Sequence, residues 1–437
     1  MGRRPWRFGA FAAGFLGLAA ALLLLLFGGP ILNRYGKGKV ERAFAKAYPG
    51  SILRIGELRY ALGSGRLVAQ TVTVRGSAAT FTGDRLALTG IGWWRLFRGR
   101  PAQEVLAKAR FEATNLDLRF AQAGYGLRCA RLRASVPDSE LTAAGTVLES
   151  LIPDEVRFAA RFRTTRFRVG VPECAIQGLA MGDCLQGLGY RAREVRLARP
   201  TFDALVNRDK PVEPARMPPA MVNEALAALE PPVWVGKLAI TEGHIKYAER
   251  LQVGAAPGVL TFAAVGLSAE DIGNRGAAKA IRVAAQGRLM DAGVLKVRLT
   301  LPLTPSAFSL HYAGSLSAMD LTRLDGFLDR AEHTRLKSGR AEKVTFQVAV
   351  NAGQAQGEVH ASYRDLKLAI LDAKTGTEKG LDNRLASFLA NRFKIRPDNP
   401  LGSEKVGRVA YRRGPNDTFI QVLWFSLRSG VLDVIYR

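Results

Sequence analysis

The side chains that most often carry catalysis are few and widely spaced in this chain. None of its histidines stands at the H-E-x-x-H spacing of a zinc protease. They are His244, His311, His333 and His360. No G-x-S-x-G elbow, Walker loop or dinucleotide-binding glycine motif occurs, and residues 63–65 (Gly-Ser-Gly) suit a hairpin turn better than a nucleophile. The sequence therefore predicts no enzyme, no metal site and no cofactor.

Thiol chemistry is equally weak as an interpretation. Three cysteines, Cys129, Cys174 and Cys184, are too few for a disulfide framework. A disulfide between Cys174 and Cys184 requires an oxidising compartment. The simpler interpretation is that the three cysteines are small, semi-buried side chains. Acidic residues such as Glu242 and Asp365 fall near strand ends, where capping and solvated charge are their ordinary roles.

The charge balance favours anionic partners. Lys and Arg number 63 against 38 Asp and Glu, which gives a formal net charge of +25. Such a charge attracts nucleic acid or anionic lipid headgroups. The arginines are spread along the whole chain, without a basic tail or a nucleic-acid-binding motif. We therefore expect a membrane partner and no nucleic acid.

A long apolar segment from Phe8 to Phe27 has no charged side chain and no polar face. A helix needs roughly 20 predominantly apolar residues to cross the hydrocarbon core of a bilayer. Residues 1–33 are thus predicted to hold a cytoplasmic tail and a single-pass membrane anchor. Anchor side chains include Phe8, Phe15, Leu22, Leu26 and Phe27.

A cleaved secretory signal is the alternative to an anchor, because Arg3, Arg4 and Arg7 form a positive N-terminal region. The apolar core of a signal usually spans about 7 to 15 residues and ends at a small-residue cleavage site. Here the core is longer and Pro30 follows it, so we expect an uncleaved anchor. Basic residues on both sides of the span leave the charge rule undecided. The short N-terminal tail favours an orientation with the bulk of the chain outside the cytoplasm.

Residues 34–200 show the two-residue period of β-strands. Apolar side chains alternate with arginines, or with Ala159 and Gly170, over residues 156–163 and again over residues 166–171. One face of each strand is then apolar and the other cationic. This alternation is typical of antiparallel sheets with one covered face, whereas parallel sheets have near-continuous apolar runs. We predict an antiparallel β region that follows a short amphipathic helix over residues 37–48.

Prolines set residues 201–235 apart as a linker with one short helix at 220–229. Strands resume in a second β region, 236–437, where residues 295–303 and 344–350 alternate clearly. Helical spacing predicts amphipathic helices at 318–336 and 380–393. Two further apolar segments close the chain.

An aromatic patch lies between basic residues at 93–97. Its members are Trp93, Trp94, Leu96 and Phe97. The patch belongs either to the hydrophobic core or to the bilayer interface, and core is the simpler interpretation.

Several strings in this order resemble the AsmA-like family of bacterial envelope proteins, relatives of chorein-type bridge-like lipid transfer proteins. The hairpin over residues 55–74, just after the apolar segment, is similar to the opening signature of that family. Similar strings in the C-terminal half are Gly314 before a helix, residues 338–339 (Ser-Gly) before a strand, and residues 357–366 (GEVHASYRDL).

The resemblance implies a mainly β fold, in which an N-terminal transmembrane helix precedes a long curved antiparallel sheet with a few amphipathic helices. One face of the sheet lines an apolar groove, and the protein is anchored in the inner membrane with its bulk in the periplasm. A non-enzymatic role in phospholipid binding or transfer follows. The groove candidates are Phe158, Phe162, Phe167, Val169, Leu295, Val297, Leu299, Phe346 and Val348. The alternative is a scaffold with a fully packed sheet that binds another envelope protein.

Overall fold

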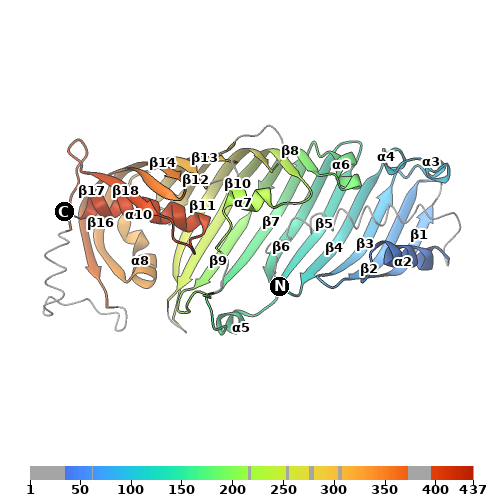
Figure 1. The fold of residues 1–437 in the computed structure, drawn as a ribbon, viewed down its shortest axis with the longest axis horizontal. Coiled ribbons are helices and arrows are strands. Elements are labelled where there is room, and N and C mark those ends of the chain that lie inside the picture. Colours follow the sequence, from blue (N-terminus) through green and yellow to red (C-terminus); the bar gives the residue numbers. More distant parts are fainter. Residues whose placement is uncertain are drawn as a thin grey trace.

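A single sheet of 18 strands organises the described residues (Figure 1). The computed structural model describes residues 35–61, 63–214, 218–251, 255–274, 280–303, 308–372 and 395–436. The predicted anchor and the predicted helix at 380–393 lie outside these ranges. Within them, no helix combines the length and apolar character needed to cross a bilayer. The prediction of a mainly β fold is confirmed.

The N-terminal half is an antiparallel meander from β1 to β7. The strands here are β1 (Ile52–Ala61), β2 (Arg66–Arg75), β3 (Thr80–Thr89), β4 (Arg110–Phe120), β5 (Tyr125–Ser135), β6 (Glu140–Ser150), β7 (Thr165–Gln177), β8 (Tyr190–Ala198) and β9 (Thr201–Asn207). The helices are α2 (Tyr35–Ala47), α3 (Trp93–Phe97), α4 (Ala102–Val105), α5 (Asp154–Phe158) and α6 (Met181–Gln186). The hairpin β1–β2 and the helix near 37–48 agree with the sequence.

The C-terminal half continues the same sheet. Its strands are β10 (Val233–Arg250), β11 (Gly258–Gly273), β12 (Ala280–Leu289), β13 (Gly293–Pro302), β14 (Leu310–Leu316), β15 (Met319–Asp320), β16 (Thr334–Asn351), β17 (Gln354–Ile370) and β18 (Val406–Arg412). Its helical segments are α7 (Val222–Ala227), η2 (Leu321–Leu324), α8 (Asp325–Glu332) and α10 (Phe419–Ile435).

The sheet is mixed and not wholly antiparallel. β10 runs parallel to β8 and then to β9, with Leu238 paired to Val195 and Tyr247 paired to Ala204. The proline-containing segment before β10 returns the chain to the same end of the sheet, which makes the parallel pairing possible. Hydrogen bonds between β10 and the strands β8 and β9 therefore join the two predicted β regions within one sheet. The division into residues 34–200, 201–235 and 236–437 stays a prediction.

Kinks interrupt the N-terminal strands near their midpoints. Thr71 on β2, Asn115 on β4 and Gly145 on β6 have φ of 52°, 51° and 63°. On β4 the buried side chains of Ala113 and Leu116 are three residues apart. Odd-numbered positions are therefore buried before the kink and even-numbered positions after it. Irregularities of this kind bend a strand and increase its twist.

The alternation at 156–163 predicted a strand, and this prediction is wrong. The structure has α5 there, followed by a turn. Pro153 precedes the helix and Asp154 lies in its first turn, which are favourable residues at a helix start.

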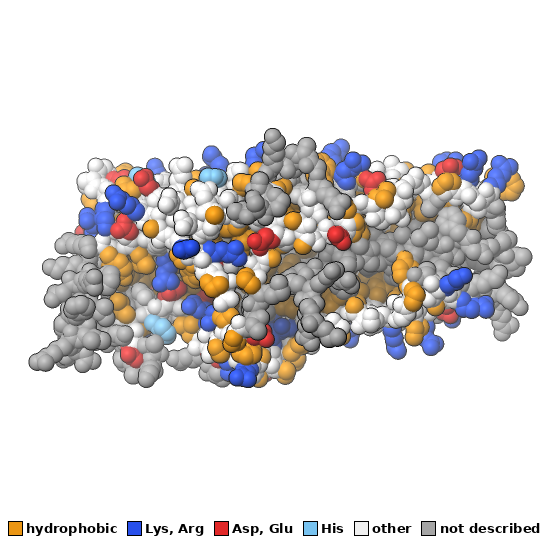
Figure 2. Space-filling view, in the orientation of Figure 1, with side chains coloured by type: hydrophobic (Ala, Val, Ile, Leu, Met, Phe, Trp, Pro, Cys, Tyr) orange, Lys and Arg blue, Asp and Glu red, His pale blue; other side chains and the backbone are white. Residues whose placement is uncertain are grey.

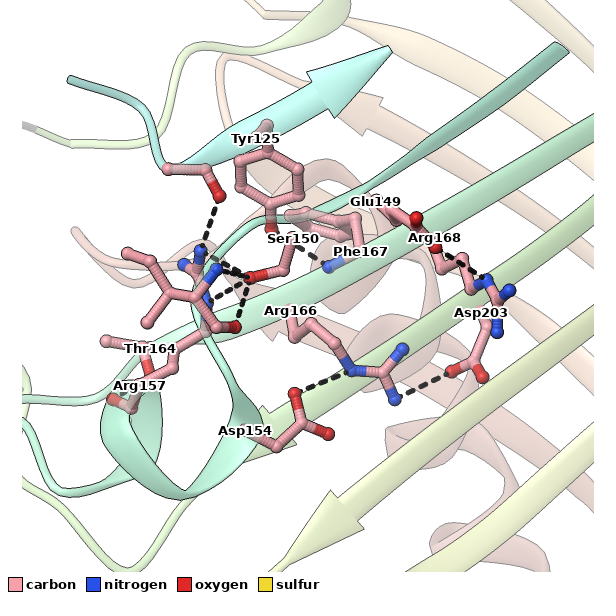
Figure 3. Close-up of polar contacts among 12 residues, drawn as sticks. Tyr125, Glu149, Ser150, Asp154, Arg157, Thr164, Arg166, Phe167, Arg168 and Asp203 are labelled. Carbon is pink, nitrogen blue, oxygen red and sulfur yellow. Dashed lines mark hydrogen bonds and ion pairs between the residues drawn. The ribbon is translucent and has the colours of Figure 1, made fainter. Parts of the chain in front are cut away.

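Ion pairs and hydrogen bonds fasten α5 to the strand ends (Figure 3). Arg166 of β7 lies 3.3 Å from Asp154 and 3.5 Å from Asp203 of β9. Arg157 of α5 donates to the Ser150 hydroxyl and lies over the Tyr125 ring. The residues that alternate at 156–163 therefore form a short helix and the bend after it, and not a strand.

Two more elements differ from the sequence prediction. The helix predicted over 318–336 is shorter, because α8 ends at Glu332 and β16 begins at Thr334, with His333 in the left-handed conformation between them. The last apolar segments form the single helix α10. Its N-terminus is a capping box in which Thr418 accepts from the Gln421 amide and the Gln421 side chain accepts from the Thr418 amide.

Candidate apolar binding surface

Two files of apolar residues run across the sheet at right angles to the strands. Each file joins residues that are direct neighbours on adjacent strands, from β2 to β18, with β9 and β15 left out. The first is Leu67, Leu88, Phe111, Ala134, Leu141, Ile176, Val195, Leu238, Ala269, Val283, Leu299, Tyr312, Val348, Gly357 and Val409.

The second file lies two residues along each strand from the first, on the same face. It is Ala69, Leu86, Ala113, Leu132, Ala143, Cys174, Leu197, Ile240, Leu267, Ala285, Val297, Gly314, Phe346, Val359 and Gly407. Neither file contains a charged residue. Because side chains two apart share a face, the files form one apolar surface along the sheet.

The middle of this surface is only half-buried. We call its half-buried members on β8 and β10 to β13 the central trough; Ala269 of β11 belongs to the first file but is only 4% exposed and is not counted among them. They are Val195, Leu197, Leu238, Ile240, Leu267, Val283, Ala285, Val297 and Leu299, and all are intermediate in exposure. Figure 2 shows hydrophobic side chains deep in the hollow along the middle of the molecule. The helix α7 covers part of this region, since its preceding residue Met221 is fully buried in one cluster with Ala269.

Helices close the apolar surface toward the N-terminal end. Phe44 of α2 packs in one cluster with Leu53 and Ile55 of β1, and all three side chains are at most 4% exposed. Met181 and Cys184 of α6 join the same cluster. The surface over β1 and the neighbouring strands is therefore a packed core.

The helix α10 closes the C-terminal end. Its Val422 and Val434 are 0% exposed and pack in one cluster with Val348 and Val359 of the sheet. The helix approaches the sheet closely at two glycines, because a Cβ atom added to Gly407 would lie 2.1 Å from the Gly430 carbonyl oxygen. Here too the apolar face is a packed core.

The structure brings most of the predicted groove residues onto this surface. Leu295, Val297 and Leu299 of β13 are half-buried, and Val297 and Leu299 belong to the central trough. Phe346 and Val348 of β16 lie in the two files but are only 6% and 1% exposed, because the closed C-terminal end buries them.

The other candidates divide into two groups. Phe167 and Val169 of β7 are half-buried, and the rings of Phe167 and Phe202 lie 5.9 Å apart. Phe158 is in α5 instead of a strand, and the Arg250 guanidinium covers its ring at 4.6 Å. Phe162 lies in the bend that follows α5. The anchor candidates are outside the described residues.

The opposite face of the sheet is charged. Arg133 of β5 donates to Glu112 of β4 at 3.1 Å, and Arg196 of β8 donates to Glu194 at 2.7 Å. Hydrogen bonding to Arg196 is the largest cause that lowers the pKa of Glu194. Such exposed pairs add little stability, but they place charge on the side away from the trough.

No group of His, Cys, Asp and Glu among the described residues has the arrangement of a metal site. All three cysteines are free, and burial raises the pKa of the Cys184 thiol to about 11 and also raises that of Cys174. These two thiols are therefore protonated at neutral pH and are poor nucleophiles.

Sequence periodicity missed the part of the trough that β8 supplies. The contribution of β8 and its parallel pairing with β10 carry no local signal, although Val195 and Leu238 are both apolar. The exposure of single residues was equally hidden, since Val297 and Val348 have the same alternating surroundings in the sequence and differ only in what covers them. No family model and no curated protein matches this chain.

Proposed function

We propose that this chain is a non-enzymatic protein of the AsmA-like type that binds, or helps to transfer, the acyl chains of phospholipids. The observation that carries the proposal is the central trough, where half-buried members of two uncharged files lie side by side on neighbouring strands. Binding sites for apolar ligands are concave and lined mainly by hydrophobic side chains. Acyl chains match a long apolar surface whose two files contain no charged side chain.

The charge pattern supports phospholipid over a neutral apolar ligand. Arginines line the outer face and the edges of the sheet, and Figure 2 shows Lys and Arg side chains along both long edges of the molecule. A phospholipid with its tails in the trough places its phosphate near such an edge. The formal net charge of +25 favours the same ligand class.

Co-purification tests the proposal directly. The full chain, extracted in a mild detergent and exchanged into a lipid-free one, is analysed by native mass spectrometry. We expect adducts with the mass of intact phospholipids that survive exchange. A protein that emerges without lipid, and that takes up no fluorescent phospholipid, is incompatible with the proposed activity.

The proposed location is the inner membrane, with a single span near residues 8–27 and the bulk of the chain in the periplasm. The length and apolar character of that segment support it. Carbonate extraction retains an anchored chain in the membrane pellet, and protease added to spheroplasts cleaves the bulk of it. A soluble fragment that begins near Ile31 indicates a cleaved signal instead.

A scaffold for another envelope protein is the second candidate. It is favoured by the closed ends of the sheet, where Val350 and Val359 are 0% exposed beneath α10. A sheet that serves only as packed core needs no half-buried apolar middle, and on this ground we place lipid binding first. Partner capture without any bound lipid favours the scaffold.

A further inference from the structure

The short helix α3 presents one tryptophan to solvent at the end of the molecule that carries α2 (Figure 1). The Trp94 side chain is 67% exposed, whereas Trp93 and Leu96 pack against the buried residues Leu88 and Val105. The aromatic patch is thus divided between the core and the surface. Tryptophan has an apolar ring and a polar N–H, and it is enriched at protein interfaces and at membrane interfaces.

Basic side chains surround Trp94. The Arg98 guanidinium lies 4.7 Å from the centroid of its ring, and Arg95 donates to the Glu104 carbonyl oxygen at 2.9 Å. Arg95, Arg98 and Arg100 are exposed, and among the described residues no carboxylate forms an ion pair with any of them. The group therefore carries uncompensated positive charge beside an apolar ring.

The turn before β2 adds another cation to this group. The Ile91 amide donates to the Gly65 carbonyl oxygen at 3.1 Å, which holds the turn against the start of α3. Arg66 follows that turn directly and is exposed, also without an ion pair in the described part of the chain. We call Arg66, Trp94, Arg95, Arg98 and Arg100 the basic tip.

The position of the basic tip indicates what it contacts. The sequence places the predicted membrane span just before Tyr35, where α2 begins, and α2 and α3 occupy the same end of the sheet (Figure 1). Tryptophan is enriched at the boundary between headgroups and acyl chains, and clustered Arg side chains are attracted to anionic lipid. A bilayer that holds the span is the nearest surface of that chemistry.

We propose that the basic tip lies against an anionic bilayer surface, with Trp94 inserted at the headgroup boundary and the arginines near lipid phosphates. The tip then acts as a second attachment beside the anchor and fixes how the sheet leaves the membrane. This inference rests on the proposed membrane location but not on lipid in the central trough, which co-purification tests separately.

Quenching by brominated lipid tests the inference. The full chain is reconstituted into phosphatidylglycerol and phosphatidylcholine vesicles whose acyl chains carry bromine near the headgroup, and tryptophan emission is recorded. We define the quenched share as the fraction of the tryptophan emission that the brominated lipid quenches. We expect this share to be smaller in Trp94→Ala than in the unchanged protein. Trp424→Ala, which removes the 40% exposed tryptophan of α10, is the matched control and should keep that share.

Charge reversal gives an independent variant that leaves the indole in place. The double change Arg95→Glu and Arg98→Glu should lower the quenched share to the level of Trp94→Ala, and vesicles of phosphatidylcholine alone should do the same with the unchanged protein. A quenched share that is equal in Trp94→Ala and the unchanged protein overturns the inference. The inference is also overturned if bromine quenches Trp94 emission equally with and without anionic lipid and with and without the charge reversal. It is overturned as well if Trp94 emission changes on addition of an acidic protein and not on addition of anionic vesicles.

Discussion

The hydroxyl of Tyr312 on β14 lies 2.7 Å from the hydroxyl of Ser426 on α10, in a buried site 114 residues apart in the chain. Tyr312 also donates to the Leu423 carbonyl oxygen at 3.0 Å. This contact fixes the position of α10 on the apolar face and thereby marks where the open trough ends. Val348, beside Tyr312 in the first file, is 1% exposed, whereas Leu299, its neighbour on the other side, is half-buried.

The Tyr312 contact predicts that the free energy of unfolding falls at alkaline pH. Burial raises the pKa of the Tyr312 phenol to about 12, whereas an unfolded chain ionises it near pH 10. Its contribution is complete below about pH 10 and is lost as the pH rises through 12. A difference of about two pKa units corresponds to about 3 kcal/mol.

We expect Tyr312→Phe to cost about 1 kcal/mol at neutral pH through the lost hydrogen bonds and to reduce the alkaline loss of stability. Urea unfolding at pH 8 and pH 11 measures both quantities. The exposed Tyr48→Phe is the control. A variant with the same alkaline loss as the unchanged protein contradicts this role of Tyr312.

The glycine contact beneath α10 predicts a steric effect. A Cβ atom at Gly430 would lie 2.6 Å from Val359 Cγ2 and 2.8 Å from Val409 Cγ2, so Gly430→Leu must lift the helix or displace both valines. Overpacking of this kind costs about 1–3 kcal/mol. Gly326→Ala in α8 is the control, because nothing lies within 4 Å of its added Cβ atom, and alanine there favours the helix by up to about 1 kcal/mol. Denaturant midpoints that shift equally for the two variants argue against close packing at Gly430.

Charge in the central trough separates a lipid surface from a packed core. Leu299 is half-buried and pairs with Val283 and Tyr312, whereas Arg298 is exposed on the other face. A carboxylate in a packed core costs several kcal/mol, enough to unfold a domain of ordinary stability. In the trough, water reaches the carboxylate when lipid is absent, so Leu299→Asp should fold and lose lipid.

Thermal melting and lipid content, measured together, test this expectation. Arg298→Asp is the matched control one residue away and should keep both properties. If Leu299→Asp is unfolded or absent from the membrane, the surface at β13 is core. If it is folded and carries as much lipid as the unchanged protein, this strand does not contact lipid.

The fold class follows from the sequence because alternation is a local property. Residues 295–303 alternate in the sequence and form β13 with Val297 and Leu299 on one face. The helix α10 was not predicted, since its β-branched and aromatic residues also suit a strand, although Thr418 and Gln421 stand at capping-box spacing. That signal is present in the sequence and outweighs the composition.

The mixed sheet and the extent of the trough depend on contacts between distant residues. Nothing near Val195 or Leu238 in the sequence indicates that these two residues pair in parallel. Burial is set in the same way, because α10 lies over Val348 and leaves Val297 half-exposed. Local patterns therefore predict which residues share a face and not which part of that face stays open.

Site-specific photo-crosslinking at Val297 tests lipid binding in the central trough most directly. A benzophenone amino acid replaces Val297 in the full chain, and the matched variant carries it at Arg298, which points to the opposite face. After irradiation of intact cells, mass spectrometry should find a phospholipid adduct at position 297 and none at position 298. Lipid adducts that are absent at 297, or equally abundant at both positions, contradict the proposed binding surface.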